Sequence, residues 1–508
     1  MRDAKFKPNV LLPQQQLESQ VEDHSPLPTW PSSRNPLKTL VIVASFLASV
    51  FILWSRQSWD TLRQNHDSFY AKITTPPQSI CPVSRGPGIS YSGHIGLRGD
   101  SDSVPKRSFF WYFEAEEDAE DAPIILTFGG GPGTSGMLSP MSAQGPCVAV
   151  ENGTAVNPNR WTEHFNFIAL DHPIGVGFSY GTRVNNSRDA AIDVYDFLQK
   201  FFHLFPHLIG NPLILSGGSY GGIYVPHIAT VIHEKNAALV AGNGPRGAIH
   251  INLESMMVSN PVSDATSYYR WMLHTRCYDV DMYNASTCAE LFAVLPACLE
   301  SIQLAQQGPG WSVEKHVAAQ KVCMLLENGD RHGTVIEDVR KKCYSTEPLA
   351  CLPPSFGWSR NFFNRSDVRD ALGIPEHVNF NILSDDVTTE FRAYGDKFQP
   401  AYLLYEPLLR DGIRLLHYVG AQDANCAWRG VISFLKLLQS PFQDEFLRAP
   451  DVPWPTADDA TVRVVGPGAG NMTYILVAQG GHFVARDQPA LVKSIVDHWV
   501  PNVPFVSS

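Results

Sequence analysis

A serine flanked by glycines is the feature of this sequence that most strongly indicates chemistry. Residues 217–221 read Gly-Gly-Ser-Tyr-Gly, with the short apolar run 212–215 before them and an amphipathic, helix-like segment directly after. A G-x-S-x-G pattern between a strand and a helix predicts a tight turn that exposes the hydroxyl of Ser219 as a nucleophile. The helix that begins there would also aim free backbone N–H groups at a developing oxyanion.

A second G-x-S-x-G stretch, residues 177–181, is centred on Ser179. Its preceding apolar run ends at Asp171, and turn-rich residues separate that run from the serine. Polar loop residues follow instead of a helix. The local context therefore favours Ser219 over Ser179 as the nucleophile.

A serine nucleophile needs a base that takes its proton and a carboxylate that orients the base. The apolar run 414–419 leads into a loop that contains Asp423, and the run 473–478 leads into Gly-Gly-His, ending at His482. The order Ser, Asp, His, with each residue after a strand, is that of α/β-hydrolases. We therefore predict a catalytic triad of Ser219, His482 as the base, and Asp423 as the residue that orients it.

The elements that must position these residues alternate along the chain. Seven short apolar runs are predicted as strands: 109–113, 123–128, 166–170, 212–215, 255–259, 414–419 and 473–478. Helical patterns follow several of them, as at 190–202 and 430–439. This alternation predicts an α/β fold with a central, mostly parallel sheet whose faces are covered. The acidic run 114–121 is predicted as a hairpin turn that joins the first two strands.

Residues 263–390 interrupt the alternation. They contain no strong strand pattern and hold six of the nine cysteines. We interpret them as a disulfide-rich, mainly helical insertion that caps the active site. A long helical excursion without a role in catalysis is the alternative interpretation.

An uncharged, strongly apolar segment of 16 residues, 39–54, lies between Lys38 and Arg56. Because about 38 polar residues precede it, an uncleaved transmembrane signal-anchor is favoured over a cleaved signal peptide or a buried core helix. The predicted organisation is a disordered cytoplasmic tail (1–38), the anchor (39–54), a stalk (55–75), a first part of the hydrolase core (76–262), the cap (263–390) and a second part of the core (391–505).

The side of the membrane on which the body lies follows from what comes after the anchor. All nine cysteines follow it. So do five N-x-S/T glycosylation sequons, at Asn152, Asn185, Asn284, Asn364 and Asn471. These features predict a glycosylated lumenal or extracellular body in the secretory pathway or vacuole, or a secreted protein if the anchor is cleaved.

Composition limits the other possible functions. The net charge of −11 argues against a nucleic-acid partner, and the 44% of hydrophobic residues suits a large globular core. The sequence has no C-x-x-C pair and no Cys/His spacing typical of zinc, so we expect neither a metal site nor a cofactor.

Longer stretches resemble the serine carboxypeptidase family over residues 80–500. Among them are YSGHI, FFWYFEA, GGGPGTSG, IALDHPIGVGFSYG, SGGSYGGIYVP, INLESMMVSNPVSD, YVGAQDANCAWRG and GGHFVARDQP. The resemblance implies an α/β-hydrolase fold and an oxyanion hole made by the backbone N–H groups of Gly131 and Tyr220. It further implies that Cys426 is a free thiol near the pocket, which leaves eight cysteines for four bridges of open connectivity.

The chain departs from this family at the three residues that hold the substrate's C-terminal carboxylate. An asparagine and two glutamates of the family are here Gly129, Ala143 and Gly218. Loss of a buried hydrogen-bonding partner of a charged group weakens binding by ~1.5–3 kcal/mol, so selectivity for free C-termini is expected to fall unless another residue substitutes. Two nearby positions also differ: Thr134 replaces a cysteine of the glycine loop, and Ala485 replaces a proline after the histidine.

Three functions are compatible with these features. The first is a membrane-anchored serine carboxypeptidase that trims peptides through an acyl-enzyme at Ser219, as the family resemblance implies. The second is a carboxypeptidase-like acyltransferase or an esterase with an ester substrate, which would not need the carboxylate-binding residues. The third is a non-catalytic binding glycoprotein, which the intact triad makes the weakest of the three.

Overall fold

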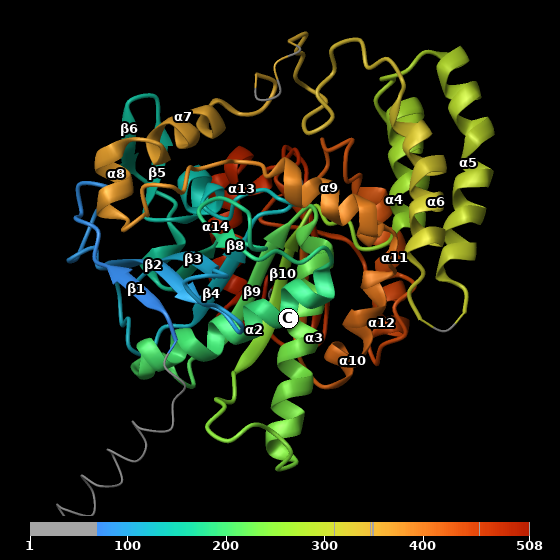
Figure 1. The fold of residues 1–508 in the computed structure, drawn as a ribbon. Helices are drawn as coiled ribbons and strands as arrows, with labels where there is room; N and C mark the ends of the chain where they lie inside the picture. The colour runs from blue at the N-terminus through green and yellow to red at the C-terminus, as the bar shows by residue number, and fades with distance from the viewer. Residues whose placement is uncertain (1–68, 309, 346, 348–349, 457, 507–508) are drawn as a thin grey trace, which may run out of the picture. The chain divides into compact units, whose positions relative to one another are not determined.

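The predicted strands assemble into one twelve-stranded mixed sheet (Figure 1). Its six central strands run parallel, in the order β7-β4-β9-β10-β11-β14. Their bounds are β7 (Asn166–Leu170), β4 (Ile124–Phe128), β9 (Leu213–Gly218), β10 (Leu253–Ser259), β11 (Arg414–Gly420) and β14 (Met472–Val477). These strands read as continuous apolar runs because helices and loops cover both faces of the sheet. The predicted α/β fold with a mainly parallel centre is confirmed.

The computed structural model describes residues 69–508 except 309, 346, 348–349, 457 and 507–508. The predicted tail, the anchor and most of the stalk lie outside the described residues. The end of the predicted stalk does not belong to a linker, because residues 71–74 form strand β1 (Ala71–Thr74), which pairs antiparallel with β2 (Ser90–Gly96).

Antiparallel strands extend the sheet on both sides. On one side lie β1, β2, β3 (Lys106–Phe113) and β8 (Tyr180–Gly181), and on the other β13 (Ala460–Val465) and β12 (Val452–Pro453). The predicted hairpin between β3 and β4 is wrong. Strand β7 lies between them, since β4 is buried along its whole length and takes a central place with parallel neighbours on both sides.

Helices cover the two faces of the sheet and enclose two apolar cores. Helices α2 (Ser187–Leu204) and α3 (Gly221–Val240) pack together on one face, in front of the sheet in Figure 1. Their buried side chains, such as Phe197 and Ile223, belong to the larger core. On the other face, α14 (Pro489–Trp499) contributes the buried Trp499 to the second core.

The segment 263–390 forms the predicted helical, disulfide-rich insertion. Its helices are α4 (Ala265–His274), α5 (Ala285–Gln306), α6 (Val313–Cys323), α7 (Pro354–Phe363), α8 (Ser366–Ala371) and α9 (Asp385–Tyr394). The sheet takes no strand from the described part of this segment. The boundary predicted at residue 390 falls inside α9, so the insertion continues to the end of that helix.

Four disulfides use eight of the nine cysteines, as the family resemblance implied. Cys81–Cys147 joins two parts of the core, and Cys277–Cys288, Cys298–Cys323 and Cys343–Cys351 lie within the insertion. Cys426 is free and buried.

Helix α5 is the one helix of the described chain that is long and apolar enough to cross a membrane by length and composition. Two disulfides tie it to its surroundings, through Cys288 to Cys277 and through Cys298 to Cys323 of α6. It packs on α4 and α6 in this structure. Here α5 is therefore an integral part of the insertion.

The fold contains a buried histidine that makes its stability depend on pH. His417 lies fully buried in β11 between the rings of Tyr405 and Phe434, and neither ring nitrogen has a hydrogen-bond partner in the described chain. Burial lowers the pKa of His417 to about 3. The unfolded chain takes up a proton at this residue below its ordinary pKa of about 6.5, so stability is present above that pH and is lost as the pH falls.

Replacing His417 by phenylalanine is therefore expected to stabilise the protein more in acid than at neutral pH. The gain in the free energy of unfolding should be about 2 kcal/mol larger at pH 5 than at pH 7.5, since each pH unit below 6.5 contributes about 1.4 kcal/mol. Chemical denaturation at the two pH values measures this difference. The same change at the exposed His250 is the control, and an equal gain at both pH values for His417→Phe would contradict the prediction.

Candidate active site

Ser219 occupies the sharp turn between β9 and α3 that the G-x-S-x-G pattern predicted. Its backbone φ is 57°, an uncommon value for a residue with a side chain. Two backbone hydrogen bonds hold it there: its N–H donates to the carbonyl of Ser259 at 3.0 Å, and its carbonyl accepts from Val262 at 2.9 Å. The neighbouring strand β10 thus fixes the turn, and Ser219 lines a cavity above the sheet.

His482 and Asp423 form the expected pair. The Nδ1 atom of His482 lies 2.7 Å from Oδ2 of Asp423, which is completely buried. Burial by itself would lower the pKa of His482, but Asp423 and the Sγ of Cys426 outweigh it and hold that pKa well above its usual value. His482 lines the same cavity as Ser219, so the structure brings the three predicted triad residues together.

Asn260, which the sequence analysis did not single out, completes the surroundings of Asp423. It directly follows strand β10, with a φ of 40°, and is fully buried. Its Nδ2 donates to Asp423 Oδ2 at 2.7 Å, and its Oδ1 accepts from the N–H of Gly420 at 3.0 Å. The other carboxylate oxygen of Asp423 accepts from the N–H groups of Asn425 and Cys426, at 2.8 and 3.1 Å. Asn260 therefore positions the carboxylate that orients His482.

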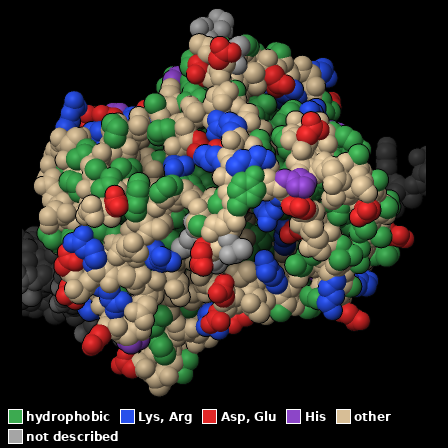
Figure 2. Space-filling view, turned by 90° about the horizontal axis from the view of Figure 1, so that it is seen from above, with side chains coloured by type: hydrophobic (Ala, Val, Ile, Leu, Met, Phe, Trp, Pro, Cys, Tyr) green, Lys and Arg blue, Asp and Glu red, His purple; other side chains and the backbone are tan. Residues whose placement is uncertain are grey.

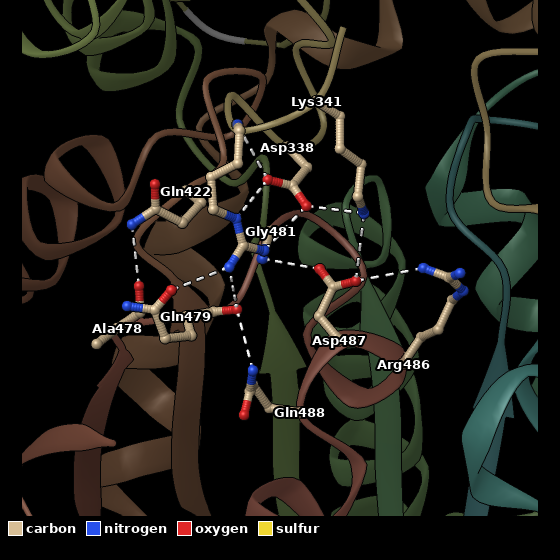
Figure 3. A network of polar contacts seen from close by, with 10 residues as sticks. Asp338, Lys341, Gln422, Ala478, Gln479, Gly481, Arg486, Asp487 and Gln488 are labelled. Atoms are coloured by element: carbon tan, nitrogen blue, oxygen red, sulfur yellow. Dashed lines mark hydrogen bonds and ion pairs between the residues drawn. The ribbon is translucent and has the colours of Figure 1, made fainter. Parts of the chain in front are cut away.

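A polar network holds the loop that carries His482 (Figure 3). Asp487 Oδ2 accepts from the N–H of Gly481 at 2.9 Å, and Lys341 lies 3.8 Å from the other oxygen of Asp487. Lys341 also pairs with Asp338 at 2.8 Å. The N–H of His482 donates to the carbonyl of Glu337 at 2.6 Å. The insertion, through residues 337–341, thus contributes directly to the position of His482.

The predicted oxyanion donors lie beside Ser219. Tyr220 directly precedes α3, where backbone N–H groups are free of intrahelical bonds. Its hydroxyl donates to Asp396 Oδ2 at 2.8 Å, which anchors the residue from the other side. The glycine loop approaches so closely that a Cβ on Gly130 would lie 2.9 Å from Ser219 Cβ and 3.0 Å from the nitrogen of Tyr220. The next residue, Gly131, is the second predicted donor.

Two cavities meet at Ser219. The larger, of about 390 Å³, is lined by Ser219, His482 and the three positions at which the family's carboxylate-binding residues are replaced, Gly129, Ala143 and Gly218. The smaller, of about 190 Å³, is lined by Ser219 and Tyr220 together with a second group of residues. These include Tyr268, Tyr269, Glu327, Lys397 and Cys426.

The replaced positions differ in how much room they leave. A Cβ on Gly129 would lie 2.0 Å from the carbonyl oxygen of Thr134, so no side chain fits there in this loop conformation. A Cβ on Gly218 would lie 2.7 Å from the Oγ of Ser259 and at an ordinary contact distance, 3.4 Å, from the carbonyl oxygen of that residue. The family's asparagine is therefore excluded by the backbone of the glycine loop itself, whereas Gly218 faces a side chain that is able to rotate.

The remaining sequence candidates lie as follows. Ser179 is buried and donates its hydroxyl to the carbonyl of Asp171 at 2.7 Å, so its role is structural. The sequon residues Asn152, Asn185, Asn284 and Asn364 are exposed, and Asn471 is half-buried.

Burial raises the pKa of the Cys426 thiol. Among the described residues, one group of potential metal ligands lies close together, Asp423, Cys426 and His482, and two of its members are already bonded to each other.

Comparisons with known proteins agree with this geometry. The model of a family described as serine carboxypeptidase matches residues 83–502. Carboxypeptidase Y homolog A of Podospora anserina is 30% identical over 422 residues, which are 81% of this chain and 72% of that protein. The protein of the same name from Sordaria macrospora is 30% identical over 421 residues, with the same coverage.

A solved structure shows the same fold. It is that of Kex1(delta)p, described as a prohormone-processing carboxypeptidase from Saccharomyces cerevisiae. The match has a TM-score of 0.70 and 22% sequence identity, and it covers 85% of this chain and 95% of that one.

Proposed function

The chain belongs to the serine carboxypeptidase family, and on this premise we propose that it releases C-terminal residues from peptides through an acyl-enzyme at Ser219. The observation that carries the proposal is the bonded pair of Asp423 and His482 on the cavity that Ser219 also lines. In this mechanism, the hydroxyl oxygen of Ser219 attacks the carbonyl carbon of the last peptide bond while His482 takes the hydroxyl proton. The N–H groups of Gly131 and Tyr220 bind the oxyanion, and His482 passes the proton to the leaving amine before water hydrolyses the acyl-enzyme.

The two cavities receive the two parts of the substrate. Because His482 protonates the leaving amine, the departing C-terminal residue occupies the larger cavity, which His482 lines. The acyl part then extends into the smaller cavity beyond Ser219 and Tyr220. There Lys397 lies 3.9 Å above the ring of Tyr268 and 3.5 Å from Glu327, so this cavity carries charged as well as aromatic groups.

Mass spectrometry of reaction products tests the proposal. Purified full-length protein in detergent is incubated with peptides whose C-termini are free or amidated, with Ser219→Ala as the control. We expect stepwise loss of C-terminal residues that requires both a free carboxylate and Ser219. The Ser219→Ala variant should lose about six orders of magnitude in kcat, the scale found when a serine nucleophile is removed.

A carboxypeptidase-like acyltransferase or esterase is the second candidate. The observation that favours it is the absence of the family's carboxylate-binding residues at Gly129, Ala143 and Gly218. Intact peptides, together with Ser219-dependent cleavage of simple esters or transfer of their acyl group, would move the assignment to this class.

We further propose that the body lies on the lumenal or extracellular side of a membrane, held by residues 39–54. Four disulfides support an oxidising compartment. The exposed sequon asparagines support glycosylation.

Glycosidase treatment of the protein made in a eukaryotic secretory host should therefore lower its apparent mass. Glutamine substitutions at Asn152, Asn185 and Asn284 should each remove part of that shift, because these side chains are exposed. Asn471→Gln is the comparison, since the half-buried Asn471 is expected to contribute least. An unchanged mass after treatment would contradict a lumenal body.

A further inference from the structure

The larger cavity has lost the family's carboxylate-binding groups but contains two arginines. Arg392 and Arg486 are the only Lys or Arg residues of the described chain that line it, and Glu337 is the only Asp or Glu. Figure 2, which views the molecule from above, shows Lys and Arg side chains gathered near the middle of this face. A cation in this cavity is suited to hold the one group that every peptide substrate carries at its end, a carboxylate.

Arg486 lines the same cavity as the three positions at which the family's carboxylate-binding residues are replaced. It belongs to α13 (Val484–Asp487), which begins two residues after His482 and packs against the π-helical turn η1 (Pro140–Gln144) that contains Ala143. The fold thus places Arg486 in the helix that packs against the turn containing Ala143. It does so on the side of Ser219 where the departing residue lies.

The guanidinium of Arg486 has donors to spare. Its side chain is 27% exposed, and its one ion pair among the described residues joins Nη1 to Asp487 Oδ1 at 3.3 Å. In Figure 3, Arg486 lies at the edge of the network, with one nitrogen toward Asp487. An arginine side chain carries five N–H donors in a planar fork that matches a carboxylate. Most of these donors therefore remain for a ligand.

Two unpartnered polar atoms flank Ala143 in the same cavity. Ser142 Oγ and Gln144 Oε1 are buried atoms without a hydrogen-bond partner in the described chain. The Oε1 of Gln144 only accepts hydrogen bonds and so offers nothing to a carboxylate, whereas the unbonded hydroxyl of Ser142 is free to bond a ligand in the cavity. The hydroxyl of Ser142 is able to donate a hydrogen bond to a carboxylate oxygen.

Arg392 fits this role less well. It is exposed at the end of α9 and lines both cavities, close enough to the ring of Tyr220 to affect its ionisation. Because Ser219 also lines both cavities, Arg392 lies at the boundary between them. A group there would lie near the reacting carbonyl and not at the end of the departing residue.

We propose that Arg486, assisted by the hydroxyl of Ser142, binds the C-terminal carboxylate of the peptide and so replaces the family's carboxylate-binding residues in this chain. The inference rests on the proposed carboxypeptidase function. It makes Arg486 the residue that determines selectivity for free C-termini. A permanently charged guanidinium pairs with an ionised carboxylate, whereas an acidic side chain must share a proton with it.

The test compares two substrates that differ in one group. An N-blocked dipeptide with a free C-terminus and its carboxamide are assayed with the full-length protein, and the ratio of their kcat/KM values is the readout. Arg486→Met should lower the free-acid to amide ratio by about 30-fold, the scale of a charge-assisted hydrogen bond, mainly through KM for the free acid. Arg486→Lys, which keeps the charge, should retain most of the ratio. Arg410→Met, at the exposed end of α10 (Tyr405–Arg410), is the matched control.

Each outcome decides a separate point. A wild-type enzyme that cleaves esters and leaves both peptides intact contradicts the carboxypeptidase function itself. A wild-type preference for the free acid that survives in Arg486→Met, or that is lost in Arg392→Met instead, overturns the role of Arg486 alone. Labelling of Ser219 by a fluorophosphonate verifies that each variant is folded. If Arg486→Met does not label, Arg486→Gln, which keeps a polar side chain without the charge, supplies the same comparison with Arg486→Lys.

Discussion

Replacing Asp423 by asparagine is expected to lower kcat about 10⁴-fold while the protein stays folded, as for the equivalent change in serine proteases. The carboxylate has two separate sets of partners. Oδ1 accepts from two backbone N–H groups, those of Asn425 and Cys426, whereas Oδ2 accepts from Asn260 and lies against His482 Nδ1. An asparagine has one oxygen and one NH₂ group for these two places.

The backbone decides which way the new amide turns. The N–H groups of Asn425 and Cys426 are unable to accept a hydrogen bond, so the amide oxygen must face them and the NH₂ group must face His482. A donor at that place forces Nδ1 of His482 to accept, which puts the imidazole proton on Nε2. In that tautomer, the nitrogen that would take the proton of Ser219 already carries one.

Steady-state kinetics on a peptide with a free C-terminus measures the loss, and the rate of fluorophosphonate labelling reports the reactivity of Ser219. Asp264→Asn is a matched control, because Asp264 is also buried but caps α4, a place where asparagine serves as well as aspartate. Retention of kcat within tenfold in Asp423→Asn would mean that Asp423 does not orient the base. A nitrogen-15 spectrum of His482 would show the change of tautomer directly.

The topology of the sheet explains why the sequence could place the three predicted triad residues near one another. Strands β9, β10, β11 and β14 are neighbours, and the carboxyl ends of parallel strands meet at one edge. Ser219, Asp423 and His482 follow three of these strands, each of which reads as a clear apolar run. Asn260 follows the fourth, directly after the predicted strand 255–259, so the same signal could have identified it.

The edges of the sheet and the loops were less predictable. Strand β1 has only four residues, half of them exposed, so its sequence carries little apolar pattern. The pairing of β3 with β7 instead of β4 depends on contacts between segments far apart in the chain. The support that Glu337 and Lys341 give to the loop of His482 likewise joins the insertion to the core across more than 100 residues. No local pattern encodes such contacts.

The second large effect is expected at the glycine loop. Replacing Gly130 by alanine should lower kcat by about 10² to 10³, the range observed when one oxyanion donor is lost. The added Cβ would lie 2.7 Å from the carbonyl oxygen of Gly218, 2.9 Å from Ser219 Cβ and 3.0 Å from the nitrogen of Tyr220. All three atoms belong to the rigid turn, so the glycine loop has to move, and it takes the N–H of Gly131 with it.

A glycine on the other side of Ser219 separates this steric effect from a general intolerance of alanine near the nucleophile. A Cβ on Gly221 would meet no atom within 4 Å, and alanine favours the helix that begins there. Gly221→Ala should therefore keep kcat within a few-fold of the wild type, since no donor moves. Kinetics of both variants, with thermal unfolding to compare their stability, distinguishes the cases. If both variants lose activity equally, the turn around Ser219 does not tolerate alanine on either side. If only Gly130→Ala does, the distance between the glycine loop and Ser219 sets the oxyanion hole.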